Sequence, residues 1–267
     1  MTTPVLLFSL PRSGSTAFCG ILNQNPEFQV IEGSLSVSLI NNLRKVFYTE
    51  PKSLATDQSR SCERVLKSAL FSYYGSSSPF VFDKNREWLF YLNIADQIFS
   101  HYKVVVLVRD PVECAASFLR LQQKEPLTWT KYDSDVVSDQ TFPQSLDFAQ
   151  RLLRRDGTIG RSYNAIVEAA AVQNRHEEML FIDYHKLCAD PIKQIDRLCT
   201  FLECDTFYPQ LDNIQNANKQ LDRHYGMFDS MHTIEKALRP AKSNLNNLEL
   251  FKHELSDMCK PFWTDWT

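Results

Sequence analysis

The sequence predicts an α/β fold in which helices cover both faces of a central parallel sheet. Four short apolar runs, rich in β-branched and aromatic residues, have the length expected of buried strands: Val5–Leu10, Phe80–Phe82, Lys103–Val108 and Met179–Ile182. Segments with helical periodicity separate these runs along the chain. Because strands that alternate with helices favour parallel pairing, and parallel sheets are covered on both faces, this order predicts the fold class.

The first half of the chain supplies four of the expected helices. Ser15–Asn25 follows the first strand, and Pro26 ends it because the residue before a proline disfavours helical geometry. In the next segment, apolar residues at helical spacing predict one buried face: Leu35, Leu39, Leu43, Val46 and Phe47. Two more helices are expected over Asp57–Tyr74 and Trp88–Ser100.

The second half continues the alternation. Val112–Gln122 leads out of the third strand as a helix, and Gln144–Arg175 is expected to be largely helical. Between them, Leu121–Pro143 is polar and contains two prolines, which predicts a loop that covers a site. Asp190-Pro191 begins a last helix that continues to Glu203, since proline suits the first helical turn.

Length and composition predict one domain over residues 1–267. A chain of 267 residues, 43% of them hydrophobic, buries about 75% of the surface that its unfolded form exposes, so its core needs no disulfide or metal. We find no internal repeat and no linker that would divide it. The polar segment from about 207 to 267 is interpreted either as a lid or cap over a ligand or as surface packing.

Charge and residue counts exclude several classes of protein. The 29 basic and 32 acidic residues give a net charge of -3, which does not hold nucleic acid by charge alone. The seven cysteines are odd in number and never in Cys-x-x-Cys spacing, which predicts reduced thiols in a cytoplasmic protein. We expect no signal peptide, because the seven-residue apolar run Pro4–Leu10 follows no basic region. We also expect no membrane span and no metal site, because no apolar run approaches about 20 residues and no His-x-x-x-His pair occurs.

The strongest motif lies where the first strand meets the first helix. The apolar run to Leu10 enters the small-residue turn Pro11-Arg12-Ser13-Gly14-Ser15-Thr16, which is P-loop-like: backbone N–H groups and a helix N-terminus point at one anion. Against the nucleotide-binding pattern G-x-x-x-x-G-K-[ST], Ser15 stands where the lysine is required, which disfavours a nucleoside triphosphatase. The alternative is a generic strand-to-helix turn, which explains Gly14 but not its polar neighbours.

A second junction is built in the same way. The strand ending at Val108 enters Arg109-Asp110-Pro111, and the helix that follows carries Ser117 about two turns along. Ligands of open α/β sheets bind at the carboxyl ends of the strands, so two such junctions predict an elongated ligand with two anionic ends. The alternative for Arg109-Asp110 taken alone is a capping ion pair.

These two junctions resemble those of the sulfotransferases that use 3′-phosphoadenosine 5′-phosphosulfate (PAPS), closest in motif to the tyrosylprotein and bacterial enzymes. In that family the first loop holds the 5′-phosphosulfate, which implies this role for Arg12, Ser13, Gly14, Ser15 and Thr16. The later arginine and serine hold the 3′-phosphate, which implies that role for Arg109 and Ser117. The resemblance spans residues 4–203 and implies a P-loop-like domain.

Two further blocks carry the resemblance, with departures. Phe82-Asp83-Lys84-Asn85-Arg86 is similar to the stretch that bears a catalytic lysine, which implies this role for Lys84; a surface lysine is the alternative. Ile182–Leu187 resembles the block whose tyrosine contacts adenine, but His185 and Lys186 replace its acidic pair, leaving Tyr184 as the transferable contact or as a core aromatic. Glu32 aligns with the first of two family glutamates and is either the catalytic base or an ordinary loop residue.

The implied activity is transfer of a sulfuryl group from PAPS to an acceptor hydroxyl or amine by in-line displacement, with Lys84 and Arg12 stabilising charge on the sulfonate and bridging oxygens. PAPS is the co-substrate and no metal is required. The acceptor is a carbohydrate, phenol, lipid or peptide, bound between the helices after Ser34 and the loop around Trp129–Tyr132. The alternatives are a P-loop nucleotide kinase and a non-catalytic adenine-nucleotide-binding module.

Overall fold

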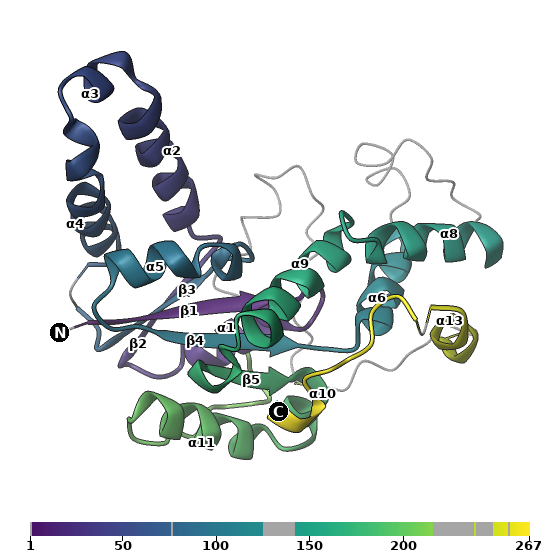
Figure 1. Ribbon diagram of the computed structural model, residues 1–267. Coiled ribbons are helices and arrows are strands. Elements are labelled where there is room, and N and C mark those ends of the chain that lie inside the picture. Colours follow the sequence, from purple (N-terminus) through teal and green to yellow (C-terminus); the bar gives the residue numbers. More distant parts are fainter. Residues whose placement is uncertain (1, 76, 125–141, 216–237, 239–247, 256) are drawn as a thin grey trace.

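Five parallel strands form one sheet in the order β2-β3-β1-β4-β5, with all arrows pointing to the same edge (Figure 1). The computed structural model describes residues 2–75, 77–124, 142–215, 238, 248–255 and 257–267. The strands are β1 (Thr3–Ser9), β2 (Phe28–Glu32), β3 (Phe80–Lys84), β4 (Lys103–Val108) and β5 (Met179–Asp183). The expected fold class is confirmed, and each of the four expected strands is present.

Helices pack on both faces of the sheet, which divides the core into two layers. Alternate side chains of β1 enter different layers: Leu6 and Phe8 face one, and Val5 and Leu7 face the other, all fully buried. The first layer is covered by α2 (Ser36–Thr49), α4 (Cys62–Tyr74), α5 (Leu92–Ile98), α6 (Pro111–Lys124), α8 (Phe142–Leu153) and α9 (Thr158–Ile166). The second is covered by α1 (Ser15–Leu22), α10 (Tyr184–Ala189) and α11 (Pro191–Leu202).

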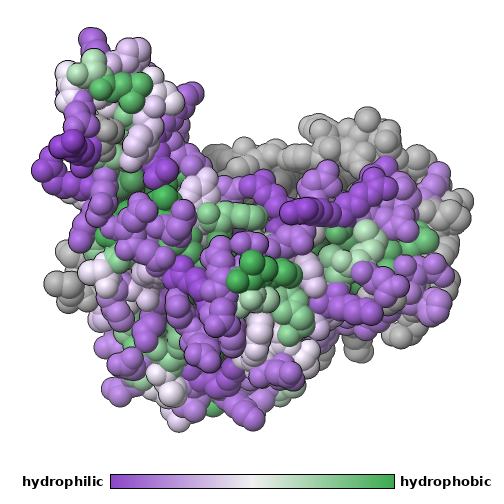
Figure 2. All heavy atoms as spheres, in the orientation of Figure 1, coloured by the Kyte–Doolittle hydropathy of each residue, from purple (hydrophilic) through white to green (hydrophobic). Residues whose placement is uncertain are grey.

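The helices α2 and α4 form a hairpin that projects from the sheet, with the short helix α3 (Pro51–Ala55) at its far end (Figure 1). The expected apolar face of α2 is partly wrong. Val37 and Ile40 are the buried apolar residues, whereas Leu35 and Val46 are more than half exposed. Apolar side chains gather toward the end of this hairpin in Figure 2, where Tyr48 and Leu54 are also exposed, because only the base of α2 reaches the sheet.

Strand β2 was not expected from the sequence. Its five residues include two polar ones, Gln29 and Glu32, and only Phe28 is buried, as expected of an edge strand that pairs with β3 alone among the described strands. The expected helix over Gln144–Arg175 is interrupted after α8 and resumes as α9, which runs into a π-helical stretch at Val167–Val172. Gly157 lies in this interruption, where a Cβ atom would clash with the carbonyl oxygen of Arg151.

Several expected boundaries shift. Leu121–Lys124, expected in a loop, form the last turn of α6, and α8 begins at Phe142; residues 125–141, with the Trp129–Tyr132 stretch, lie outside the described residues. Of the polar C-terminal segment, the structure describes residues 207–215 and 238, the helix α13 (Leu248–Leu255) and the chain from 257 to 267, where Trp263 is buried. Among the described residues, no helix combines the length and apolarity needed to span a bilayer.

Candidate active site

The carboxyl ends of β1 and β4 form the centre of the candidate site. These strands are neighbours, but the helices that follow them leave to opposite faces, α1 to one and α6 to the other. Such a switch point opens a crevice at the edge of an α/β sheet. Here Arg12 Nε donates to Ser117 Oγ at 3.2 Å, and Arg109 Nη1 donates to the carbonyl oxygen of Arg12 at 3.2 Å. The structure thus brings the two predicted junctions together.

The first loop is held in a tight, partly strained turn. Arg12 has a φ of 66°, a left-handed conformation that non-glycine residues adopt at a cost of about 1–3 kcal/mol. Ser13 is fully buried, and both its N–H (3.2 Å) and its hydroxyl (2.7 Å) donate to the carbonyl oxygen of Leu10. Ser13 therefore shapes the turn, while the first-turn N–H groups of α1 have no intrahelical acceptor.

Gly14 is required by both its backbone and its neighbour. Its φ of 84° is unfavourable for other residues, and a Cβ atom there would lie 2.2 Å from Cε2 of Tyr184. The Tyr184 ring therefore rests against the first loop. The ring also lies beside Arg109, whose guanidinium carbon is 5.0 Å from the ring centroid. Tyr184, predicted as a nucleotide contact, thus touches both junctions.

The buried guanidinium of Arg109 is also paired with a carboxylate. Arg109 Nη2 lies 3.2 Å from Glu113 Oε2, four residues along the chain. Glu113 Oε2 lies 2.6 Å from His185 Nε2 on α10, and Oε1 lies 3.3 Å from Lys252 Nζ on α13. Burial by itself would raise the pKa of Glu113, but the charges of His185 and Arg109 outweigh it, so the pKa is lowered.

On the other side of β1, strand register places Lys84 between two partners. Its Cα is paired with that of Leu7, two residues before the end of β1, and with that of Glu32, the last residue of β2. Burial raises the pKa of Glu32, and the charge of Lys84 offsets part of that rise. One carboxylate oxygen of Glu32 is buried and has no hydrogen-bond partner among the described residues. Residues predicted from separate motifs therefore meet at one edge.

A buried carboxylate precedes Lys84 in β3, and its side chain lies on the opposite face of the sheet. Asp83, fully buried on β3, accepts a 2.7 Å hydrogen bond from the hydroxyl of Tyr74 at the end of α4. Burial raises the pKa of Asp83, whereas this hydrogen bond lowers it. The loop after Glu32 is tied to the same strand end, since Asn85 Nδ2 donates to the carbonyl oxygen of Ser34 at 3.0 Å.

We expect the substitution Tyr74→Phe to lower the free energy of unfolding by about 1.5–3 kcal/mol, because it removes a hydrogen bond to a buried carboxylate. Chemical denaturation measures this change. The matched control is Tyr73→Phe, which removes a more exposed hydrogen bond from the Leu35 N–H and is expected to cost less. Equal losses in the two variants would contradict the importance assigned to the Tyr74–Asp83 contact.

Sequence reasoning missed Glu113 and Lys252, and noted His185 only as a departure. Glu113 had a weak signal, since it stands four residues after Arg109 on a helix, the spacing of side chains that touch. His185 and Lys252 had none, because only tertiary packing brings α10 and α13 to α6. The described residues contain no cluster of three or more His, Cys, Asp or Glu side chains suited to a metal ion.

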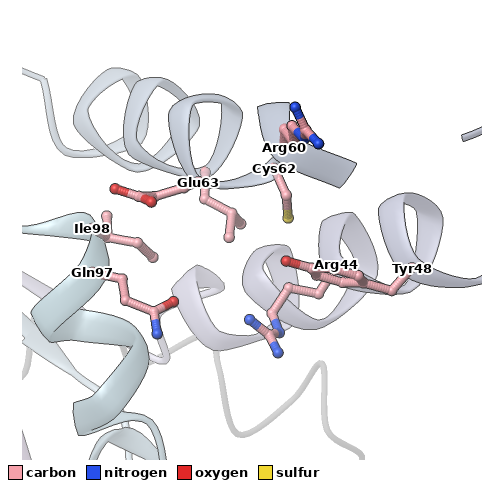
Figure 3. Close-up of a pocket in the computed structure, with 8 residues that line it drawn as sticks. Arg44, Tyr48, Arg60, Cys62, Glu63, Gln97 and Ile98 are labelled. Atoms are coloured by element: carbon pink, nitrogen blue, oxygen red, sulfur yellow. The ribbon is translucent and has the colours of Figure 1, made fainter. Parts of the chain in front are cut away.

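A hollow on the projecting hairpin is distinct from this site. It lies between α2, the start of α4 and the end of α5 (Figure 3). Its lining mixes charges and apolar groups and includes none of the predicted site residues: Arg44, Tyr48, Arg60, Cys62, Glu63, Leu66, Gln97 and Ile98. The carboxyl edge of the sheet therefore remains the candidate active site.

Comparison with solved structures supports the fold. A sulfotransferase from Alicyclobacillus acidocaldarius superposes with a TM-score of 0.50 at 16% identity, over 85% of this chain and 92% of that one. Mouse sulfotransferase SULT7A1, in a structure complexed with PAP, gives a TM-score of 0.50 at 14% identity, over 96% of this chain and 82% of that one. These likenesses concern the fold. A search of curated protein sequences finds no match.

The sequence comparison with protein families is more specific. Residues 4–209 match the family described as "Sulfotransferase family", which covers both strand-to-helix junctions, Glu32, Lys84 and the Tyr184 block. The match extends over most of the 267 residues and ends just after α11. With the two junctions meeting at the switch point of a parallel sheet, this match shows that the chain belongs to the sulfotransferase family.

Proposed function

We propose that this sulfotransferase moves a sulfuryl group from PAPS to an acceptor hydroxyl or amine. The observation that carries the proposal is the convergence of two loops, each at the carboxyl end of a strand, through the contacts of Arg12 with Ser117 and Arg109. PAPS has two anionic ends joined by adenosine, so it fits two adjacent anion sites. The presence of PAP in the mouse SULT7A1 structure supports this choice of co-substrate.

In the proposed reaction the acceptor oxygen attacks sulfur while the bond from sulfur to the bridging phosphate oxygen breaks. Lys84 and Arg12 stabilise the negative charge that develops on the leaving and sulfonate oxygens. Glu32 takes the proton of the acceptor hydroxyl, and 3′-phosphoadenosine 5′-phosphate leaves. The register pairing of Glu32 with Lys84 supports this division of roles, since a carboxyl group and an amino group on paired residues suit proton removal and charge stabilisation at one reaction centre.

The remaining residues are proposed to hold the nucleotide. Gly14, Ser15 and Thr16 bind the 5′-phosphate through N–H and hydroxyl groups at the start of α1. Ser13 supports them by fixing the turn, because its own donors are bonded to Leu10. On the far side, three residues bind the 3′-phosphate and the adenine: Arg109, Ser117 and Tyr184.

The substitution Glu32→Gln tests the base. It keeps the volume but removes the proton acceptor, so we expect kcat to fall by about 10²-fold. Because the pKa of Glu32 is raised, the wild-type rate should decline on the acid side at a pH above the ordinary glutamate range, as the carboxylate becomes protonated. The pH–rate profile checks this, and the variant should lack that acid limb. An unchanged profile would direct attention to His224 or His232, which lie outside the described residues.

The decisive experiment is an assay with radiolabelled PAPS over a panel of carbohydrates, phenols, lipids and peptides. A labelled product formed in the presence of EDTA supports the sulfotransferase reaction. Turnover that requires ATP and Mg²⁺ would instead indicate the nucleotide kinase, and tight nucleotide binding without any labelled product would indicate the non-catalytic module.

Two proposals concern the chain as a whole. We propose that it works in the cytoplasm, supported by seven cysteines that are all free thiols, since disulfides are rare in reducing compartments.

We also propose that residues 1–267 act as one domain, whose C-terminal part caps the nucleotide. The contact of Lys252 with Glu113 supports this cap, because it brings α13 to the second junction. The segments 216–237 and 239–247 lie outside the described residues.

A further inference from the structure

The carboxylate of Glu113 is shared by three basic side chains, those of an arginine, a histidine and a lysine, from three different parts of the fold. Arg109 at the end of β4 and His185 on α10 both reach Oε2, at 3.2 Å and 2.6 Å. Lys252 on α13 reaches Oε1 at 3.3 Å. The Glu113 side chain is only 13% exposed, so these contacts are poorly screened by water.

Arg109 and His185 compete for the same oxygen atom. Both lie within hydrogen-bond or ion-pair distance of Oε2, and the side chain of Arg109 is 6% exposed whereas that of His185 is 41% exposed. His185 can therefore exchange protons with solvent, while Arg109 cannot change its charge. A positive charge on His185 would neutralise part of the negative charge of Glu113. The attraction between Glu113 and Arg109 would then be weaker than when His185 is neutral.

We propose that His185 regulates the affinity of Arg109 for a 3′-phosphate by competing with it for Glu113. When His185 is protonated, it compensates the carboxylate, and the Arg109 guanidinium is available to the phosphate. When His185 is neutral, Glu113 draws Arg109 back, and the phosphate is bound more weakly. This inference rests on the proposed function, because it assumes that the second junction receives a 3′-phosphate.

The other groups around His185 do not reverse this sign. Its backbone N–H donates to the carboxylate of Asp183 at 2.8 Å, and the ring of Tyr184 lies 6.1 Å from its own. Across the cluster, the charge of Arg120 also acts on Arg109, which adds to the positive surroundings. Lys186, the next residue on α10, donates instead to the carbonyl oxygen of Thr267. Protonation of His185 therefore adds positive charge beside the proposed 3′-phosphate site.

The test measures the dissociation constants of 3′-phosphoadenosine 5′-phosphate and of AMP between pH 5.5 and 8.5, by calorimetry, for the wild type and His185→Gln. AMP lacks the 3′-phosphate and so reports on the first loop alone. The quantity compared is the ratio of the dissociation constant of AMP to that of 3′-phosphoadenosine 5′-phosphate. At pH 5.5 we expect this ratio to be on the order of tenfold larger in the wild type than in the variant, and at pH 8.5 we expect the two proteins to give the same ratio. The phosphate also gains charge over this range, but equally for both proteins.

Two more variants sharpen the comparison. His101→Gln makes the same substitution at an exposed histidine just before β4, at the opposite end of that strand, and should behave as the wild type. Glu113→Gln removes the shared carboxylate. Its preference for the 3′-phosphorylated nucleotide over AMP should therefore depend on pH as little as that of His185→Gln. The preference itself should be retained at pH 8.5. Loss of selectivity in Glu113→Gln at every pH would show that Glu113 only holds Arg109 in place, and would overturn the inference.

The outcomes separate this inference from the proposed function. A wild type that binds both nucleotides equally at every pH would refute the 3′-phosphate site itself. A wild type that prefers the 3′-phosphorylated nucleotide, with the same pH dependence in His185→Gln, would refute only the role of His185.

Discussion

Replacement of Lys84 by alanine is expected to lower kcat by on the order of 10²–10³, with little change in nucleotide affinity. In the proposed mechanism the ammonium group interacts most strongly once the leaving oxygen becomes negative, so its loss affects the transition state more than the bound ground state. Steady-state kinetics with saturating PAPS, together with the dissociation constant of 3′-phosphoadenosine 5′-phosphate, measure the two effects separately.

The control for Lys84 is another strand lysine. Lys103 is the first residue of β4, so it lies at the edge of the sheet opposite to Lys84, and its ammonium pairs with Glu203 at 3.2 Å. Lys103→Ala should leave kcat unchanged while removing the same kind of side chain. Wild-type turnover in Lys84→Ala would exclude Lys84 from the mechanism. A fall in affinity that matches the fall in kcat/KM, with kcat unchanged, would make it a binding residue.

The second large effect is expected in nucleotide selection. If Arg109 and Ser117 bind a 3′-phosphate, losing both charged hydrogen bonds weakens binding by about 3–6 kcal/mol, which is at least on the order of 10²-fold. The enzyme should therefore prefer PAPS to adenosine 5′-phosphosulfate. Arg109→Ala should lose most of this preference while the first loop still binds the 5′ end.

Thermal unfolding provides the readout for Arg109→Ala. At about 100 times its Kd, 3′-phosphoadenosine 5′-phosphate should stabilise the wild type by roughly 2.7 kcal/mol, and AMP at the same concentration should do much less. Arg155→Ala, an exposed arginine after α8, is the matched control and should retain the difference. Equal stabilisation of the wild type by both nucleotides would refute the two-site interpretation, and a shift only with ATP and Mg²⁺ would favour the kinase.

The central strands and the two junctions were predictable because their signals are local. Strands such as β4 are buried on both faces, so their sequences are continuous apolar runs that are recognised without knowing their neighbours. The turn at Gly14 has the small residues that a close approach to Tyr184 requires, although the identity of that neighbour was not readable. A resemblance to a known family then linked residues that lie far apart in the chain.

What could not be predicted depends on tertiary contacts. Strand β2 is five residues long and is interrupted by the polar residues Gln29 and Glu32, so it lacks the apolar run that identified the others, and a loop position was one of the two alternatives for Glu32. The pairing of Arg109 with Glu113 follows helix spacing, but the arrival of His185 and Lys252 depends on how α10 and α13 pack. The helix face of α2 was overestimated because periodicity does not reveal how far a hairpin extends beyond the sheet.

The pairing of Glu32 with Lys84 is set by the hydrogen-bond ladder between β2 and β3, and a ladder shifts only in whole residues. Deleting one residue within β2 would not move Glu32 slightly but would turn its side chain to the opposite face of the sheet, into the layer that alternate residues occupy. Loops at this edge can lengthen without disturbing the pair, whereas the length of β2 cannot change. The backbone register of β2 and β3 thus fixes the position of the proposed base relative to the proposed cation. A change in register would separate the two side chains completely rather than shift them slightly.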